Sequence, residues 1–168
     1  LENKKIVNLI LLVLILVFAF LVRVYNIENV PSGVYPDEAV NGIDALKALT
    51  TGDYQWFYPD NNGREGLMMN LVALSFKIFG VSIFALKLPS AIFGVLTVLG
   101  TYLLTKELFR SRRAGLLAAF FTAFSFWAIN FSRISFRANM LPAILTFSFY
   151  YLFCGIRYNK IIYDLKNK

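Results

Sequence analysis

Two adjacent carboxylates, Asp37 and Glu38, lie in the segment GVYPDEAVNG, shortly after a long apolar run. A carboxylate in such a place can take a proton from an attacking hydroxyl group, as a general base does. Asp37 also follows Pro36 and precedes a helical pattern, so an alternative role is to cap a helix and favour its positive end. The two roles are compatible, because a cap holds a carboxylate in place and a catalytic base needs a fixed position.

Four basic residues are candidates for binding an anion: Arg64, Lys87, Arg133 and Arg137. Arg64 lies in NNGREGL, where its alternative role is a solvated charge paired with Glu65. Arg133 and Arg137 are four residues apart in INFSRISFRANMLP, so a helical turn would align them on one face. Their alternative role is to reach lipid headgroups. Lys87 begins an apolar run, where a lysine also serves as a membrane anchor.

These residue types suit the transfer of a sugar from a lipid phosphate. Phosphate is already a fair leaving group, so a single displacement at the anomeric carbon needs one carboxylate to take the acceptor's proton. The reaction also needs cations that hold the departing phosphate. Asp37 supplies the carboxylate in this scheme, and the three arginines supply the cations.

The elements that must position these residues are membrane helices. The chain is 58% hydrophobic and only 16% charged, whereas a soluble domain is about half apolar and about a quarter charged. A spanning helix needs roughly 17–25 apolar residues. Four runs are long enough: about 6–22, 86–104, 114–131 and 140–157. We therefore expect one all-α, polytopic membrane domain over residues 1–168, with four transmembrane helices.

Charge predicts the orientation of these helices. Basic residues cluster at positions 4–5, 106–113 and 157–168. The positive-inside rule places all three clusters in the cytoplasm, so both termini are expected there and residues 23–85 form a long loop outside. Seven of the ten acidic residues lie in that loop. The net charge of +7 therefore reports topology, and no nucleic acid is expected as a partner.

The outer loop contains two helical patterns. Over about 38–50, apolar residues recur at spacings of four, three and three: Ala39, Ile43, Leu46 and Leu49. The apolar run 67–79 is only 13 residues long, and runs of about 10–14 residues are more often interfacial or buried than spanning. We expect both segments to be interfacial helices on the membrane surface.

Two absences exclude several classes of chemistry. The chain has no histidine, which removes histidine acid–base catalysis, Ser-His triads and ordinary zinc sites. Cys154 is the single cysteine, so no disulfide can form within the chain.

Three segments carry a resemblance to a known family: YPDEAVNGIDALKALTTGDY, REGLMMNLVALSFKIFGVSIFALKLPSAIFGVLTVLGTYLLTKELF and FWAINFSRISFRANMLP. They resemble the GT-C membrane glycosyltransferases, in particular the bacterial relatives of protein O-mannosyltransferases and the aminoarabinose transferase of lipid A. The resemblance covers nearly the whole chain. It implies a fold in which these residues form the N-terminal part of a larger membrane enzyme.

The resemblance also implies roles for single residues. It makes Asp37 the catalytic base and gives Glu38 a role in binding a divalent ion or the acceptor. Arg64 takes the position of a phosphate-binding lysine, Lys87 stands where relatives usually have arginine, and Arg133 matches the arginine of the Ser-Arg turn. The chain departs from the pattern at REGL, where relatives often have Lys-Pro-Pro-Leu, and at Arg137, where many relatives have glutamate.

The expected function is therefore a glycosyltransferase that moves a sugar from a polyprenyl-phosphate donor to an acceptor on the extracytoplasmic face, by an inverting displacement. The expected partners are this donor and membrane lipids, and the oligomeric state is left open. A divalent cation, held by Asp37 and Glu38, is the one cofactor that the sequence leaves open. The alternatives are a non-catalytic membrane protein that binds or transports anionic lipids, and a small assembly subunit; only the enzyme requires the Asp37 carboxylate.

Overall fold

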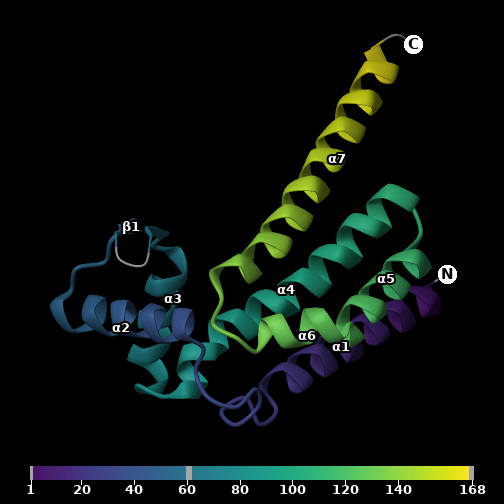
Figure 1. Ribbon diagram of the computed structural model, residues 1–168. Helices are drawn as coiled ribbons and strands as arrows, with labels where there is room; N and C mark the ends of the chain where they lie inside the picture. Colours follow the sequence, from purple (N-terminus) through teal and green to yellow (C-terminus); the bar gives the residue numbers. More distant parts are fainter. Residues whose placement is uncertain (1, 60–61, 167–168) are drawn as a thin grey trace.

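The computed structural model of the chain describes residues 2–59 and 62–166, and it is almost entirely helical (Figure 1). The seven α-helices are α1 (Glu2–Val24), α2 (Pro36–Thr51), α3 (Leu67–Phe79), α4 (Ile83–Phe109), α5 (Arg112–Phe124), α6 (Phe126–Ser132) and α7 (Met140–Lys166). A 3-10 helix, η1 (Arg137–Asn139), precedes α7, and two short strands, β1 (Phe57–Tyr58) and β2 (Arg64–Glu65), precede α3. The predicted all-α class is confirmed.

Among the described residues, α1, α4 and α7 are long and apolar enough to cross a membrane. The third predicted span, 114–131, is not one straight helix, because α5 and α6 meet at an angle of 61°. The break is at Ser125, which has an extended backbone and whose Oγ accepts a hydrogen bond from the Ala128 N–H at 3.5 Å. Ser125 therefore ends α5 and caps α6. The four predicted spans correspond to α1, α4, the bent α5–α6 pair and α7.

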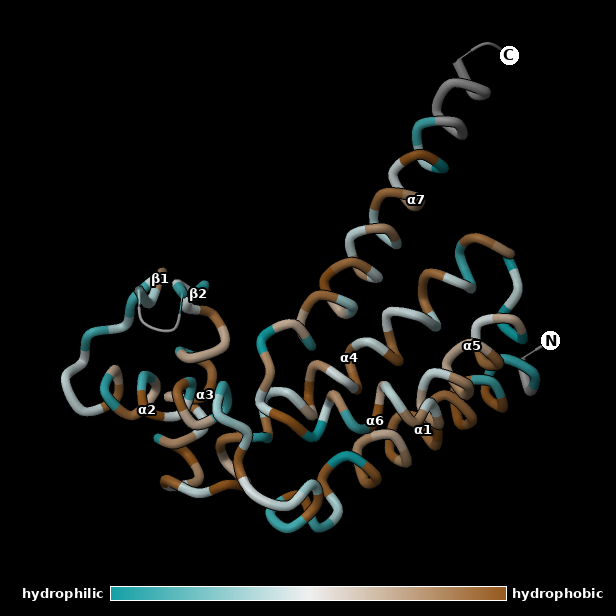
Figure 2. Tube along the Cα trace, in the orientation of Figure 1, coloured by the Kyte–Doolittle hydropathy of each residue, from teal (hydrophilic) through white to brown (hydrophobic). Residues whose placement is uncertain are grey.

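Helix α4 is the centre of the bundle and packs against α1, α3, α5, α6 and α7. Small residues permit this close approach, as in many membrane helix pairs. A Cβ on Gly94 would meet the Ser132 and Arg23 side chains, and a Cβ on Gly100 would meet Thr146. The outward faces of α1 and α7 remain apolar and exposed, since only 11% of each candidate span is buried (Figure 2). Such faces suit contact with lipid.

The segment between α1 and α4 folds as a small loop subdomain of α2, the β1–β2 hairpin and α3. Its core combines residues of these elements with the start of α4: Ala45, Ala48, Tyr58, Met68, Met69, Val72, Ala73, Phe76, Ala85 and Leu86. The hairpin pairs Phe57 with Glu65 and Tyr58 with Arg64. Gly66 ends it at a position where a Cβ would collide with the Gln55 carbonyl. The sequence analysis did not predict these paired strands.

Both predicted loop helices are present. α3 has the predicted bounds, and α2 begins two residues earlier than predicted, at Pro36. On the apolar face of α2, Leu49 packs against the subdomain core, whereas Ile43 and Leu46 are exposed. Their predicted contact with the membrane surface stays a prediction.

Candidate active site

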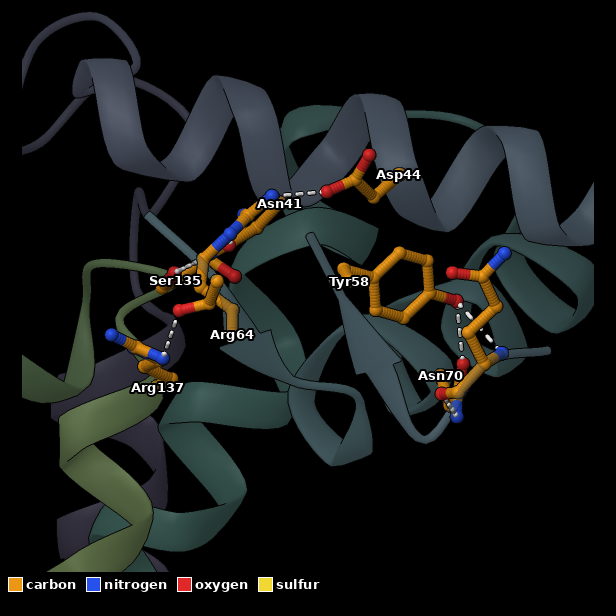
Figure 3. Close-up of polar contacts among 9 residues, drawn as sticks. Asn41, Asp44, Tyr58, Arg64, Asn70, Ser135 and Arg137 are labelled. Carbon is orange, nitrogen blue, oxygen red and sulfur yellow. Dashed lines mark hydrogen bonds and ion pairs between the residues drawn. The ribbon is translucent and has the colours of Figure 1, made fainter. Parts of the chain in front are cut away.

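A polar cavity of about 170 Å³ lies where the loop subdomain meets the segment between α6 and α7. Its lining comes from α2, the hairpin and η1: Asp37, Asn41, Asn62, Arg64, Phe136 and Arg137. Figure 3 shows how Asn41, Arg64, Ser135 and Arg137 gather here from distant parts of the chain. A larger cavity of about 220 Å³ lies between α4, α6 and α7, but its wall is mainly apolar and has no charged residue.

Asp37 is half-buried in the first turn of α2, directly after Pro36. The first amides of a helix carry partial positive charge, so this position favours an ionised carboxylate. The helix start therefore holds Asp37 at the wall of the polar cavity. The predicted capping role of Asp37 is wrong, because Tyr35 is the N-cap residue and Glu38 accepts its N–H. The same placement leaves its carboxylate beside the cavity that Arg64 and Arg137 also line.

Arg64 is buried, with 3% of its surface exposed, and it is held by two residues of α2. Its NH1 group donates to Asn41 Oδ1 at 2.5 Å, and its NH2 group forms an ion pair with Asp44. Asp44 is a functional candidate that sequence reasoning missed. Its signal was its spacing, because residues 37, 41 and 44 follow one face of a helix.

Arg137 donates to Glu65 Oε2 at 2.7 Å, and both side chains are exposed. The predicted pairing of Arg64 with Glu65 is wrong, because adjacent strand residues point to opposite faces of the hairpin. Arg64 faces α2, and Glu65 faces η1. A hydrogen bond from its own backbone N–H, followed by the charge of Arg137, lowers the pKa of Glu65.

Lys87 and Arg133 are buried elsewhere, in a group of contacts that we call the carbonyl cradle. Lys87 Nζ lies 3.3–3.4 Å from three backbone oxygens, those of Ile27, Pro31 and Gly33. Arg133 donates at 2.5–3.1 Å to the backbone oxygens of Val22, Tyr25 and Val30. Both cations therefore fix the chain between α1 and α2, and neither lines the polar cavity.

The prediction that a helical turn aligns Arg133 and Arg137 on one face is wrong. The chain turns between Arg133, which follows α6, and Arg137, which begins η1, and it forms no continuous helix there. The role of Arg133 and Lys87 in binding a donor phosphate stays a prediction. The structure does not bring either of them together with Asp37 in the polar cavity.

Arg23 is a buried cation that the sequence placed at the start of the loop. It is fully buried at the end of α1, where Nε donates to Ser132 Oγ at 3.1 Å and NH1 donates to the Ala19 backbone oxygen at 3.0 Å. Within the described residues, its NH2 group has no hydrogen-bond partner. The signal for it was an arginine within the apolar run AFLVRVY.

The donor set around Glu38 does not fit a divalent cation. Glu38 is 1% exposed, and its two carboxylate oxygens accept backbone N–H groups, Oε2 from Tyr35 at 2.9 Å and Oε1 from Ser135 at 2.5 Å. A metal ligand must direct an oxygen lone pair at the ion, usually with several other oxygens. Among the described residues, no group of three or more His, Cys, Asp or Glu side chains lies close enough to hold a metal ion.

Residues 67–164 match the family model of dolichyl-phosphate-mannose-protein mannosyltransferases, over more than half of the chain. The chain belongs to this family. The comparisons with curated proteins and with solved structures found no match. Family membership confirms the resemblance and makes the chain a membrane glycosyltransferase of the GT-C type. The matched segment runs from α3 into α7, so it contains Lys87, Arg133 and Arg137 but begins after Asp37, Glu38 and Arg64.

Proposed function

We propose that this family member transfers a sugar from a polyprenyl-phosphate donor to an acceptor, with Asp37 as the general base. The observation that carries the proposal is the polar cavity, where a half-buried carboxylate and two arginines meet. The family is named for dolichyl-phosphate mannose, which is a sugar on a polyprenyl phosphate. A carboxylate and cations in one cavity are the groups that such a donor requires.

The reaction is a single displacement with inversion at the anomeric carbon. A hydroxyl oxygen of the acceptor attacks this carbon while Asp37 takes the hydroxyl proton. The bond between the anomeric carbon and the phosphate oxygen breaks, and the phosphate leaves with the electron pair. Arg64 and Arg137 stabilise the negative charge that develops on the leaving phosphate, because charged hydrogen bonds are strongest where charge builds up.

We further propose that the loop subdomain lies outside the cytoplasm. The basic segments at the N-terminus and in the α4–α5 turn lie at the opposite end of the bundle from α2 and α3 (Figure 1). The positive-inside rule supports placing these basic segments in the cytoplasm. The polar cavity would then open on the face where a flipped lipid-linked sugar is available.

The decisive experiment compares Asp37→Asn with the parent protein in membrane vesicles that contain a polyprenyl-phosphate sugar. Asparagine has nearly the same size and shape as aspartate, but it is no useful base. We expect Asp37→Asn to insert and bind donor normally, and to lose about 10²–10⁴-fold in transfer rate. Asp53→Asn is the matched control, since Asp53 is an exposed acid of the same loop.

Two results would overturn the proposal. Near-normal transfer by Asp37→Asn would show that the Asp37 carboxylate is not the base and only favours the positive end of α2. Donor binding without any transfer by the parent protein would favour the lipid-binding alternative. The same assay tests orientation. Sealed vesicles with the cytoplasmic face outward and vesicles with that face inward present an added donor to opposite faces of the protein. Transfer only from the cytoplasmic face would contradict the proposed topology.

A further inference from the structure

Glu38 links two segments that lie 97 residues apart. Its Oε2 accepts the N–H of Tyr35, the residue that caps α2, and its Oε1 accepts the N–H of Ser135. Ser135 lies in the turn between α6 and η1 and is fully buried. The Glu38 carboxylate therefore fastens this turn to the start of α2.

A second residue of α2 holds the backbone of the same residue, Ser135. Asn41 Nδ2 donates to the Ser135 backbone oxygen at 2.9 Å, so Ser135 is held through both its N–H and its carbonyl group. Glu38 and Asn41 are three residues apart and share one helical face. The Ser135 hydroxyl group has no hydrogen-bond partner among the described residues. The backbone of Ser135, and not its side chain, makes the link.

This link sets the dimensions of the polar cavity. Asp37 immediately precedes Glu38, and Phe136 and Arg137 immediately follow Ser135. These neighbours form two facing parts of the cavity wall. Asn41 also accepts a hydrogen bond from Arg64 NH1. A shift of the turn away from α2 would therefore change the position of Arg137 relative to the Asp37 carboxylate.

We propose that Glu38 is a positioning residue that, together with Asn41, holds the turn at residues 133–137 against α2. The inference rests on the proposed function of the cavity, and it replaces the expected role of Glu38 in binding a divalent ion or the acceptor. A base must reach the proton that it removes. Glu38 is 1% exposed, and both its oxygens already accept backbone N–H groups.

A thiol reporter at the turn tests the link without any need for catalysis. Ser135→Cys keeps the backbone N–H and changes a buried side chain that makes no hydrogen bond, and Cys154→Ser removes the native thiol. We expect the reporter to be protected in the parent. Glu38→Gln keeps one acceptor oxygen and turns an NH2 group towards an N–H donor. Loss of a charged hydrogen bond should raise the labelling rate about 10–100-fold through local opening of the turn.

Asn41→Asp is the second variant. It keeps an acceptor for Arg64 but lacks the N–H that binds the Ser135 carbonyl group, so labelling should rise here as well. Glu28→Gln is the control, because Glu28 is an exposed acid of the same loop and should leave labelling unchanged. If labelling in Glu38→Gln and Asn41→Asp stays at the parent rate, the link does not hold the turn and the proposal fails.

Transfer kinetics then separate positioning from direct catalysis. We expect Glu38→Gln with native Ser135 to lower kcat about 10–100-fold, since small misplacements in an active site have effects of this size. The pH dependence of kcat should keep the shape of the parent profile, because Asp37 is still present. If the fall of kcat at low pH disappears in Glu38→Gln, Glu38 is a catalytic group and the proposal is overturned. A parent that transfers no sugar would refute the proposed function alone, because the labelling result does not depend on turnover.

Discussion

The polar cavity and the carbonyl cradle each contain two basic side chains, but these side chains have different partners. In the cavity, Arg64 and Arg137 each pair with a carboxylate, Asp44 and Glu65 respectively. In the cradle, Lys87 and Arg133 donate to backbone oxygens at the end of α1 and in the chain between α1 and α2. A cation paired with a carboxylate can exchange that partner for a phosphate. A cation that satisfies buried carbonyl groups cannot leave without exposing them.

The comparison separates two kinds of defect. Substitution in the cradle should mainly reduce the stability of the fold, because buried acceptors lose their donor. Substitution in the cavity should mainly reduce use of the donor lipid, because the fold keeps its backbone hydrogen bonds. The two effects are measured independently, by unfolding of the solubilised protein and by transfer kinetics.

The largest effect is expected for Arg133→Ala in the cradle. It removes a buried arginine that donates to three part-buried backbone oxygens, and charged hydrogen bonds contribute about 1.5–3 kcal/mol each. We expect the free energy of unfolding to fall by about 3 kcal/mol or more, with an unchanged donor KM in the protein that still folds. Thermal unfolding in detergent measures the first quantity. Lys77→Ala, at an exposed lysine of α3, is the control.

The opposite pattern for Arg133→Ala would break the comparison. Normal unfolding together with a donor KM raised about tenfold or more would return Arg133 to the phosphate-binding role that its resemblance implied. Lys87→Met should follow Arg133→Ala, with a smaller effect, because the contacts of Lys87 are longer.

A smaller effect is expected in the cavity when Arg64 loses its charge. Arg64→Ala alone would leave Asp44 buried and unpaired, so the informative variant is the double change Arg64→Gln with Asp44→Asn. Charged hydrogen bonds contribute about 1.5–3 kcal/mol, so we expect kcat/KM for the donor to fall about 10–100-fold. Asp44→Asn alone keeps the cation and should keep donor use. Equal donor use in both variants would show that Arg64 only supports α2.

The sequence predicted the elements better than it predicted their partners. Apolar runs and spacings of three and four residues placed the spans and both loop helices, because these patterns are local. The bend at Ser125 was not predictable from hydropathy, since the residues on both sides of it are equally apolar. The β1–β2 hairpin has only two residues in each strand, too few for an alternating pattern.

Partner choice at the site depends on contacts between distant segments. The residue types at positions 37, 38, 64 and 137 were identified from sequence, and three of them line one cavity. No local pattern predicts that Glu38 binds the backbone of Ser135, or that Arg64 binds Asp44 rather than its neighbour Glu65. Arg23 had a local signal, but its partner Ser132 lies 109 residues away and could not be predicted.

The smallest effect is expected at the exposed pair of Arg137 and Glu65. The pair lies at the cavity wall, but exposed ion pairs contribute little and are screened by salt. Because the pKa of Glu65 is lowered in the folded protein, pairing favours the ionised form, and its contribution is present above the ordinary value of 4.5. The contribution is lost as pH falls through the lowered pKa.

Glu65→Gln should therefore unfold at a slightly lower temperature than the parent at neutral pH and low salt. The difference should vanish in acid, where the parent carboxylate is protonated, and also at about 1 M salt, where the Debye length is about 3 Å. Arg137 itself is unchanged in this variant and stays available to a donor phosphate, so the donor KM should not rise. A difference in unfolding that persists in acid and in high salt would mean that Glu65 holds η1 by contacts other than charge. The cavity would then resemble the cradle, and the distinction between the two groups of cations would fail at this position.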